Sequence, residues 1–238
     1  MRIIELDEVD STQKMAKKLS EEIEEDFVVV AKRQTSGYGR KGNIWFSPEG
    51  GLWFTLAIKN VDKKLELIPI IVAVSVAKML ERIIKINIQL KWPNDIYINN
   101  RKIGGIICEA TTIGESLNRV LIGVGINVNI NEMPMEISYK STSIKIETGR
   151  EYNIMEILRE IIKEIYANMR TSMDEILREW RNRDIIVGRK VKILLMNKSI
   201  EAKVIEINSD GSITIEYDNK WIDLNYWQVN GIEILNSI

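Results

Sequence analysis

Residues 34–45 read Gln-Thr-Ser-Gly-Tyr-Gly-Arg-Lys-Gly-Asn-Ile-Trp, a loop sequence that holds three glycines and two cations. Glycine permits positive φ angles and close backbone approach, so consecutive N–H groups can converge on a phosphate. Arg40 and Lys41 would supply positive charge to the same anion. The stretch therefore indicates an anion-binding loop; the alternative is a mobile surface turn, which can have the same composition.

Apolar, β-rich runs lie on both sides of this loop, at residues 27–31 and 51–58. The loop is therefore predicted to connect two buried strands. Ser11 precedes apolar residues at helical spacing, which predicts a capped amphipathic helix over 11–25. A second, buried helix is expected over 67–84, where Val, Ala and Ile predominate.

Strands and helices are expected along the rest of the chain as well. Strands are predicted at 88–92, 95–98, 102–107 and 119–129, with turns at 99–101 and Gly114, and helices at 153–166 and 172–183. After Arg183 the sequence changes to short alternating runs separated by turn residues, which predicts five strands in a small SH3-like barrel. We therefore expect two domains, 1–184 and 185–238.

The composition excludes several classes of function. The 238-residue chain has 33 Lys and Arg against 34 Asp and Glu, so its charge gives no reason to expect nucleic acid as the main partner. Histidine is absent, which removes Ser-His-Asp and Cys-His catalysis and the commonest zinc ligands. The single cysteine, Cys108, is expected to be a small buried hydrophobe. With no leader sequence and no run long enough to cross a bilayer, we expect a cytoplasmic protein that does not bind membranes.

The segment 91–95, Lys-Trp-Pro-Asn-Asp, carries polar groups where a plain core would not want them. A cation, an amide and a carboxylate surround an X-Pro corner at a strand end, and Lys102 follows across the hairpin. Asp95 and Lys102 could therefore face one cavity. The alternative is an ordinary ion pair on a surface hairpin.

The strand around residues 122–129 has two glycines, Gly123 and Gly125, on the same face. Such a gap is required where a flat ligand or another backbone lies against a sheet. Asn127 and Asn129 continue the same period-two alternation, so amide donors and acceptors are expected on that face.

Together these segments resemble the catalytic core of biotin protein ligases. Asp10-Ser11-Thr12 is similar to the family's opening Asp-Ser-Thr, residues 34–45 resemble its adenylate loop, and 91–95 match its Lys-Trp-Pro-Asn-Asp motif. The likeness continues through the segments 102–106, 123–127 and 141–144 in the expected order.

The resemblance implies a two-step ligase. Biotin and Mg-ATP would give biotinyl-5′-AMP and pyrophosphate, and a lysine of a biotin carboxyl carrier domain would then attack the mixed anhydride. It also implies an α/β catalytic domain of the class II synthetase type, with a mixed sheet and helices packed on one side, before the SH3-like domain. The Asp-Ser-Thr motif begins about ten residues from the start, so we expect no helix-turn-helix domain and no DNA binding.

The resemblance also assigns residues. Catalytic roles fall on Lys102, Arg40 and Asp95, with Asp95 orienting Lys102, holding a metal or acting as a base. The expected biotin-binding residues are Ser11, Thr12, Gln13, Gln34, Gly37, Tyr38, Gly39, Arg40, Lys102 and Gly105. The expected ATP and adenylate contacts are Arg40, Trp45, Asn94, Lys102, Asn127 and Ser143, with Trp45 as a hinge or wall.

Tyr38 departs from the family, many members of which have arginine at this position. The tyrosine ring would then order the closed loop by packing instead of by charge. Two other functions remain open: a lipoate or octanoate ligase or transferase, and a non-catalytic nucleotide-binding interaction module. Exposed strand edges in the catalytic sheet further lead us to expect a homodimer.

Overall fold

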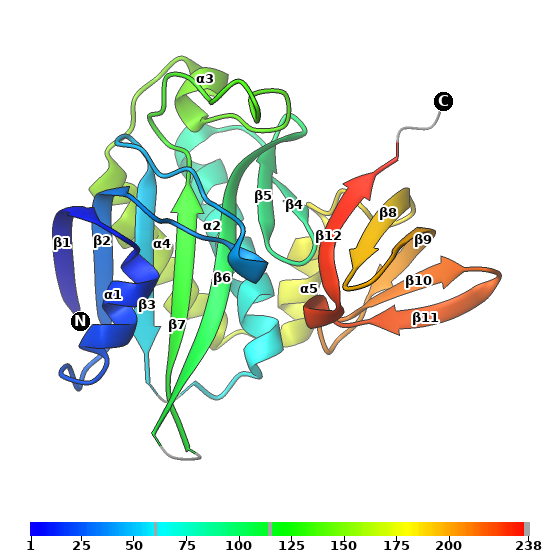
Figure 1. Ribbon diagram of the computed structural model, residues 1–238, viewed down its shortest axis with the longest axis horizontal. Coiled ribbons are helices and arrows are strands. Elements are labelled where there is room, and N and C mark those ends of the chain that lie inside the picture. The colour runs from blue at the N-terminus through cyan, green and yellow to red at the C-terminus, as the bar shows by residue number, and fades with distance from the viewer. Residues whose placement is uncertain (60, 114–115, 236–238) are drawn as a thin grey trace.

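Two β-sheets form the frame of the computed structural model, which describes residues 1–59, 61–113 and 116–235 (Figure 1). The larger sheet has seven strands in the order β1-β2-β3-β7-β6-β5-β4, and the smaller has five in the order β11-β10-β9-β8-β12. Strands of the larger sheet are β1 (Arg2–Val9), β2 (Phe27–Gln34), β3 (Leu52–Ile58), β4 (Gln89–Lys91), β5 (Asp95–Ile98), β6 (Arg101–Ile113) and β7 (Ser116–Ile126). Strands of the smaller sheet are β8 (Lys190–Leu195), β9 (Ser199–Ile207), β10 (Ile213–Tyr217), β11 (Lys220–Leu224) and β12 (Val229–Ile234).

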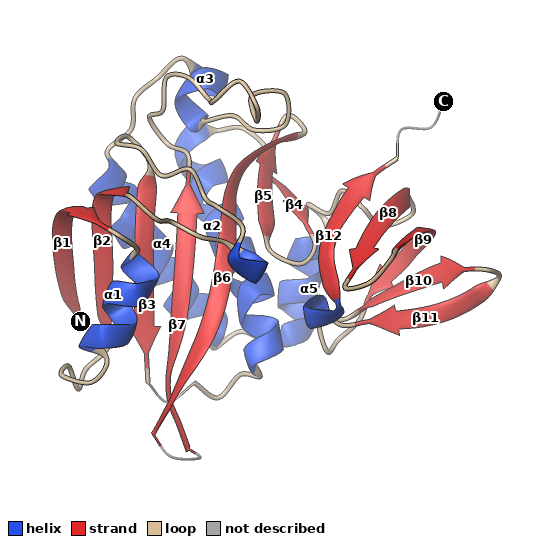
Figure 2. Ribbon diagram, viewed as in Figure 1, coloured by secondary structure: helices blue, strands red, loops and turns tan. Residues whose placement is uncertain are grey.

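The larger sheet is mixed, because β1 runs parallel to β2 while its other neighbouring strands pair antiparallel. The five α-helices of the described residues are α1 (Thr12–Leu19), α2 (Ile68–Ile84), α3 (Ile144–Thr148), α4 (Ile154–Met169) and α5 (Met173–Arg181). Single 3-10 turns occur at Arg40–Gly42, Leu65–Leu67 and Tyr226–Gln228. This arrangement confirms the α/β class with a mixed sheet, which Figure 2 shows by element type.

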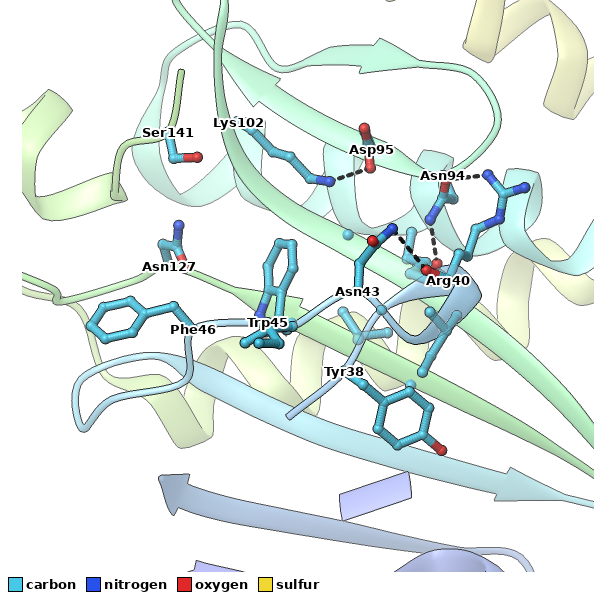
Figure 3. Close-up of a pocket in the computed structure, with 18 of the residues that line it drawn as sticks. Tyr38, Arg40, Asn43, Trp45, Phe46, Asn94, Asp95, Lys102, Asn127 and Ser141 are labelled. Carbon is cyan, nitrogen blue, oxygen red and sulfur yellow. Dashed lines mark hydrogen bonds and ion pairs between the residues drawn. The ribbon is translucent and has the colours of Figure 1, made fainter. Parts of the chain in front are cut away.

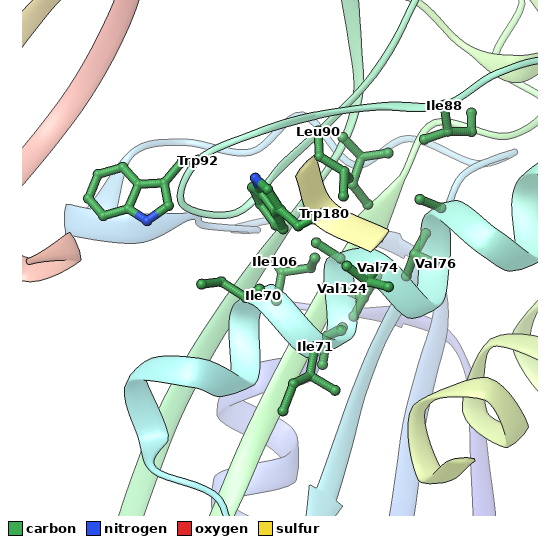
Figure 4. Packing of buried hydrophobic residues seen from close by; sticks show 14 of the residues in the cluster. Ile70, Ile71, Val74, Val76, Ile88, Leu90, Trp92, Ile106, Val124 and Trp180 are labelled. Carbon is green, nitrogen blue, oxygen red and sulfur yellow. The ribbon is translucent and has the colours of Figure 1, made fainter. Parts of the chain in front are cut away.

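The main core lies between the larger sheet and helices α2, α4 and α5. Helix α2 is buried nearly all round because its Val, Ile and Ala side chains face both the sheet and the other helices. Figure 4 shows Ile70, Ile71 and Val74 of α2 within this cluster, near Val124 of β7. Burying such side chains contributes roughly 1.5–3 kcal/mol each.

Helix α1 lies on the opposite face of the sheet, so the helices are not all on one side. Ala16 packs there in a separate cluster with Phe27, Val29 and Leu121. The Ser11 side chain caps α1 by accepting a hydrogen bond from the Gln13 N–H. Because the helix starts at this cap, Thr12 is held beside Gln34 of β2 and Thr55 of β3.

The smaller sheet is fastened to the larger one at β4. The Leu90 N–H donates to the Arg183 carbonyl at 2.8 Å, and the Ile185 N–H donates to the Leu90 carbonyl at 3.1 Å. Trp92 is 1% exposed, and its indole N–H donates to the Gly211 carbonyl at 2.9 Å. Five strands follow Asp184, as predicted, and they form an antiparallel sheet whose edges are β11 and β12.

Most predicted elements are confirmed, with differences at the edges of the fold. Strand β1 was not predicted, since charged residues face outward along its exposed edge position. Helix α1 ends at Leu19 instead of residue 25, strand β6 extends to Ile113, and the short helix α3 was missed. The predicted turn at Gly114 lies outside the described residues. Across the described ranges, no helix is long and apolar enough to cross a membrane.

Candidate active site

A cavity of about 470 Å³ lies where the larger sheet, the loop 38–46, the segment 133–141 and strand β12 meet. Figure 3 shows Trp45 of the loop, Asp95 and Lys102 of the sheet, and Ser141 around one space. The lining residues that sequence analysis selected are Ser11, Thr12, Gln13, Gln34, Tyr38, Gly39, Arg40, Trp45, Asn94, Asp95, Lys102, Gly105 and Asn127. Arg40 and Lys102, the two expected catalytic cations, therefore line the same cavity.

Hydroxyl and amide groups form a connected network at one end of the cavity. The Gln34 side-chain oxygen accepts from the Thr12 N–H at 2.8 Å and from the Thr12 hydroxyl at 3.1 Å. The Gln34 amide nitrogen donates to the Ser47 hydroxyl at 2.9 Å. The Thr55 hydroxyl, fully buried, lies 3.0 Å from both the Thr12 hydroxyl and the Gln13 amide oxygen. This end can recognise a compact polar head group that offers both donors and acceptors.

Gly37 supports this network from behind and does not line the cavity. A Cβ atom at Gly37 would lie 2.5 Å from the Ser47 hydroxyl oxygen and 2.8 Å from the Gln34 amide nitrogen. Only glycine leaves room for the Gln34–Ser47 hydrogen bond. Gly37 thus helps to place Gln34 in this structure, and its contact with biotin stays a prediction.

The Trp45 indole lies against a glycine strip of the larger sheet, formed by Gly105 and Gly125. A Cβ atom at Gly125 would lie 2.6 Å from the indole nitrogen, and one at Gly105 would lie 3.6 Å from the ring. The Lys102 ammonium is 5.1 Å from the ring centroid. The buried indole N–H has no hydrogen-bond partner among the described residues, so it remains available to a ligand. Trp45 thus lines the cavity.

Lys102, Asp95 and Lys91 form a charged cluster in the same cavity. The Lys102 ammonium lies 2.5 Å from Oδ1 of Asp95, and the Lys91 ammonium lies 3.5 Å from Oδ2. Burial would raise the pKa of Asp95, but the charges of Lys102 and Lys91 outweigh it and hold the pKa below its ordinary value. Asp95 is therefore a carboxylate between two ammonium groups.

This pairing does not suit a metal ligand. Both oxygens of Asp95 already face ammonium groups, which would repel a divalent cation. In the described parts of the chain, no group of three or more Asp, Glu or Cys side chains could hold a metal ion. Asp95 thus holds Lys102 in this structure, and its role as a metal ligand stays a prediction.

Arg40 is held at the junction of the two sheets. Its Nη2 atom donates to the Val229 carbonyl at 2.8 Å and also to the Tyr226 carbonyl, while Nη1 lies 3.4 Å from the Asn94 side-chain oxygen. The Tyr226 ring lies 5.4 Å from the guanidinium carbon. Burial lowers the pKa of Arg40, although the nearby charge of Asp95 opposes this, and a guanidinium remains protonated regardless.

Tyr38 fixes the outer side of the loop. Its hydroxyl lies 3.2 Å and 3.4 Å from the two carboxylate oxygens of Glu109 on β6. Burial raises the pKa of Tyr38, and the Glu109 charge adds to the effect, so the phenol is a neutral donor. The loop is therefore anchored through a hydrogen bond to the sheet, in addition to any packing of the ring.

This chain is similar to known proteins in both sequence and structure. Residues 6–127 match the model of the biotin/lipoate A/B protein ligase family. The bifunctional ligase/repressor BirA of Bacillus spizizenii is 30% identical over 225 residues, which cover 90% of this chain and 69% of that protein. The chain belongs to the biotin/lipoate A/B protein ligase family. The biotin protein ligase from Aquifex aeolicus, solved in complex with biotin and ATP, superimposes with a TM-score of 0.86 at 30% identity and covers 98% of this chain and 99% of its own.

Human biotin–protein ligase is a further relative of the family, at 32% identity over 156 residues. That match covers 58% of this chain and 21% of the human protein. The structural likeness to the Aquifex aeolicus ligase extends through the five-stranded C-terminal sheet, since nearly the whole chain superimposes.

The expected adenylate residues Asn94, Asn127 and Ser143 differ in their placement. Asn94 and Asn127 line the cavity, and their amide groups donate to the carbonyls of Ile106 at 2.6 Å and Thr142 at 2.8 Å. Ser143 does not line it: the side chain is fully buried, and its hydroxyl donates to the Ile130 carbonyl and caps α3. The expectation that Ser143 contacts the adenylate is corrected to a structural cap.

Sequence analysis missed two walls of the cavity. The segment 133–141 contributes Met133, Ile137, Lys140 and Ser141, and strand β12 contributes Asn230, Gly231 and Ile232. Apart from Ser141, which opens the segment 141–144, the residues of these two walls belong to no recognised motif, because their sequence resembles that of an ordinary loop and strand. The pairing of Lys102 with Ser141 brings the segment 133–141 to the site. The docking of the smaller sheet brings strand β12 there.

Proposed function

We propose that this protein is a biotin protein ligase, which activates biotin with ATP to biotinyl-5′-AMP and transfers the biotinyl group to a lysine of a biotin carboxyl carrier domain. One observation carries the proposal. The Thr12–Gln34 hydrogen-bond network and the cations Arg40 and Lys102 line one cavity of about 470 Å³. A polar head group and a phosphate can therefore be bound at the same time.

In the first step, a carboxylate oxygen of biotin attacks the α-phosphorus of ATP and the bond to pyrophosphate breaks. Lys102 and Arg40 stabilise the negative charge that gathers on the phosphoryl oxygens. Asp95 holds the Lys102 ammonium in place, 2.5 Å away, without joining the chemistry. The step needs position and charge compensation, and histidine has no part in it.

In the second step, the neutral amine of the acceptor lysine attacks the carbonyl carbon of biotinyl-5′-AMP. An amide bond forms, the bond to the phosphate oxygen breaks, and AMP leaves with its negative charge. The amine loses one proton to solvent or to phosphate. Asp95 is poorly suited to accept it, because two ammonium groups lower its pKa.

Magnesium enters this scheme as part of the substrate Mg-ATP. The carboxylate nearest the cations, Asp95, is occupied by Lys91 and Lys102. The ATP phosphates themselves supply oxygen ligands of the kind that Mg²⁺ prefers.

The direct test is biotin-dependent exchange of labelled pyrophosphate into ATP. The proposal requires exchange with biotin, and little with lipoate or octanoate offered at the same concentration. Preference for lipoate or octanoate would favour the alternative enzyme class of the same family. Absence of exchange with every acid, together with ATP binding, would favour the non-catalytic interaction module.

The proposal also covers the domain division, the cellular location and the oligomeric state of the protein. The chain divides into a catalytic domain, 1–184, and an SH3-like domain, 185–238. It works in the cytoplasm, where ATP and carboxylases are available. It forms a homodimer through an exposed edge of the larger sheet, where β1 is the outermost strand. Sedimentation velocity of the whole protein tests the last feature, and a monomer at every concentration would contradict it.

A further inference from the structure

The loop that covers the cavity is fastened to the smaller sheet by two cations. Arg40 donates to the carbonyls of Tyr226 and Val229, and the Lys41 ammonium donates to the Trp227 carbonyl at 2.9 Å. All three acceptors lie in the turn 226–229, which consists of η3 (Tyr226–Gln228) and the first residue of β12. Residues almost 190 positions apart in sequence therefore form one joint beside the cavity.

The chemistry of this joint suits an arginine that must later meet a phosphate. Carbonyl oxygens orient a guanidinium but carry no net charge, so they leave its positive charge uncompensated. Within the described residues, Arg40 forms no ion pair with a carboxylate. Its contacts to Tyr226, Val229 and Asn94 use three of the five guanidinium N–H donors. The remaining donors can face an anion in the cavity, which Arg40 lines.

Lys41 has a different position from Arg40 although it is the next residue. It does not line the main cavity, it is exposed, and its backbone has a positive φ of 58°. Such a conformation is unfavourable for lysine by about 1 kcal/mol, so another interaction has to maintain it. The contact with the Trp227 carbonyl is on the outer side of the loop, where it can hold the loop without touching a ligand.

The geometry assigns Lys41 and the turn 226–229 as a positioning device for Arg40, a role that rests on the proposed ligase function. Lys41 clamps the loop onto the smaller sheet, the carbonyls of the turn orient the guanidinium, and Arg40 then retains the acyl-adenylate. The smaller sheet thus holds the loop 38–46 in place and also lines the cavity through Asn230 and Ile232.

Hydrogen exchange of the ligand-free whole protein tests the clamp independently of activity. Lys41→Met removes the donor and keeps the length of the side chain, Lys41→Arg restores a donor, and Lys220→Met is a control on the exposed strand β11. We expect Lys41→Met to exchange about 3- to 5-fold faster in both the 35–47 and the 225–230 peptides, as for the loss of one partly exposed charged hydrogen bond. Lys41→Arg and Lys220→Met should match the wild type. Unchanged exchange in the 225–230 peptide of Lys41→Met would overturn the clamp.

Release of biotinyl-5′-AMP after a single turnover tests the positioning role. Lys41→Met should release the intermediate about 3- to 5-fold faster, with the KM for biotin unchanged, because Lys41 lies away from the Thr12–Gln34 network. In an Arg40→Met background the same substitution should have no further effect, since its action passes through Arg40. Additive effects, or release at the wild-type rate from Lys41→Met, would overturn the role. Absence of any adenylate from the wild type would instead contradict the ligase function and leave the exchange result to decide on the clamp.

Discussion

The Lys102 ammonium lies 2.5 Å from Oδ1 of Asp95, and Lys91 occupies the other carboxylate oxygen at 3.5 Å. The Asp95 and Lys102 side chains are 17% and 26% exposed, so the pair is only partly screened by solvent. One carboxylate thus fixes the Lys102 ammonium, which lines the cavity, and Lys91 keeps the carboxylate in place. The cluster retains a net positive charge, which suits the binding of ATP.

The first prediction concerns the two members of this pair. Lys102→Ala should lower the rate of adenylate formation by about 10³-fold, since it removes a charge at the reacting phosphate. Asp95→Asn should lower it by only about 10- to 100-fold, because the ammonium remains and loses its orientation. Biotin-dependent pyrophosphate exchange measures both. Lys220→Ala on β11 is the control for removal of a lysine, and equal losses for Asp95→Asn and Lys102→Ala would contradict the division of roles.

The second prediction is a pH dependence of stability. The folded-state pKa of Asp95 is below its ordinary value of 3.8, so its ion pairs stabilise the fold fully above that value. The stabilisation is lost as the pH falls through the folded-state pKa. Urea unfolding between about pH 2.5 and 6 should therefore show a smaller acid loss of unfolding free energy in Asp95→Asn than in the wild type. An equal loss of unfolding free energy at low pH in both proteins would show that the pKa of Asp95 is not lowered by folding.

The main fold and much of the site were predictable because they follow from local patterns. Residues 27–31 and 51–58 form strands as their β-branched and aromatic content indicates, and the turn at 99–100 pairs β5 with β6. That hairpin brings Asp95 and Lys102 together, so the proximity of these two could be inferred from sequence.

The remaining features depend on contacts that local patterns do not encode. Ser143 belongs to the segment 141–144 that resembles the family. Its hydroxyl nevertheless caps α3, because the helix begins at the next residue. The carbonyls that hold Arg40 are main-chain atoms, and a sequence gives no sign of where they point. Strand β1 was missed because an edge strand buries too little to show the alternating pattern.

The third prediction concerns Tyr38, where many relatives have arginine. Tyr38→Phe removes the hydroxyl that lies 3.2 Å from Glu109 and should speed release of biotinyl-5′-AMP about 2- to 5-fold. Tyr38→Arg should retain the intermediate at least as well as the wild type, because a guanidinium can pair with the Glu109 carboxylate. A single-turnover chase measures the release rate. In Glu109→Gln, the benefit of Tyr38→Arg over Tyr38→Phe should disappear, and its persistence would contradict the pairing.

The fourth prediction concerns the glycine strip beneath Trp45. An alanine Cβ at Gly125 would lie 2.6 Å from the indole nitrogen, closer than such contacts allow, whereas one at Gly105 would make an ordinary contact at 3.6 Å. Gly125→Ala should therefore displace the indole from the cavity wall and raise the KM for biotin by about 10-fold or more, while Gly105→Ala should have a smaller effect.

The substitution Trp45→Phe, which puts a smaller ring at this position, distinguishes displacement of the indole from damage to strand β7. Because Trp45 is in a loop and partly exposed, its movement should leave the melting temperature of Gly125→Ala within a few degrees of the wild type. In the double variant Gly125→Ala with Trp45→Phe, the shorter side chain relieves the contact, so part of the affinity for biotin should return relative to Gly125→Ala alone. A double variant that binds biotin more weakly than either single variant would show that the alanine acts on the ligand directly and not through the indole.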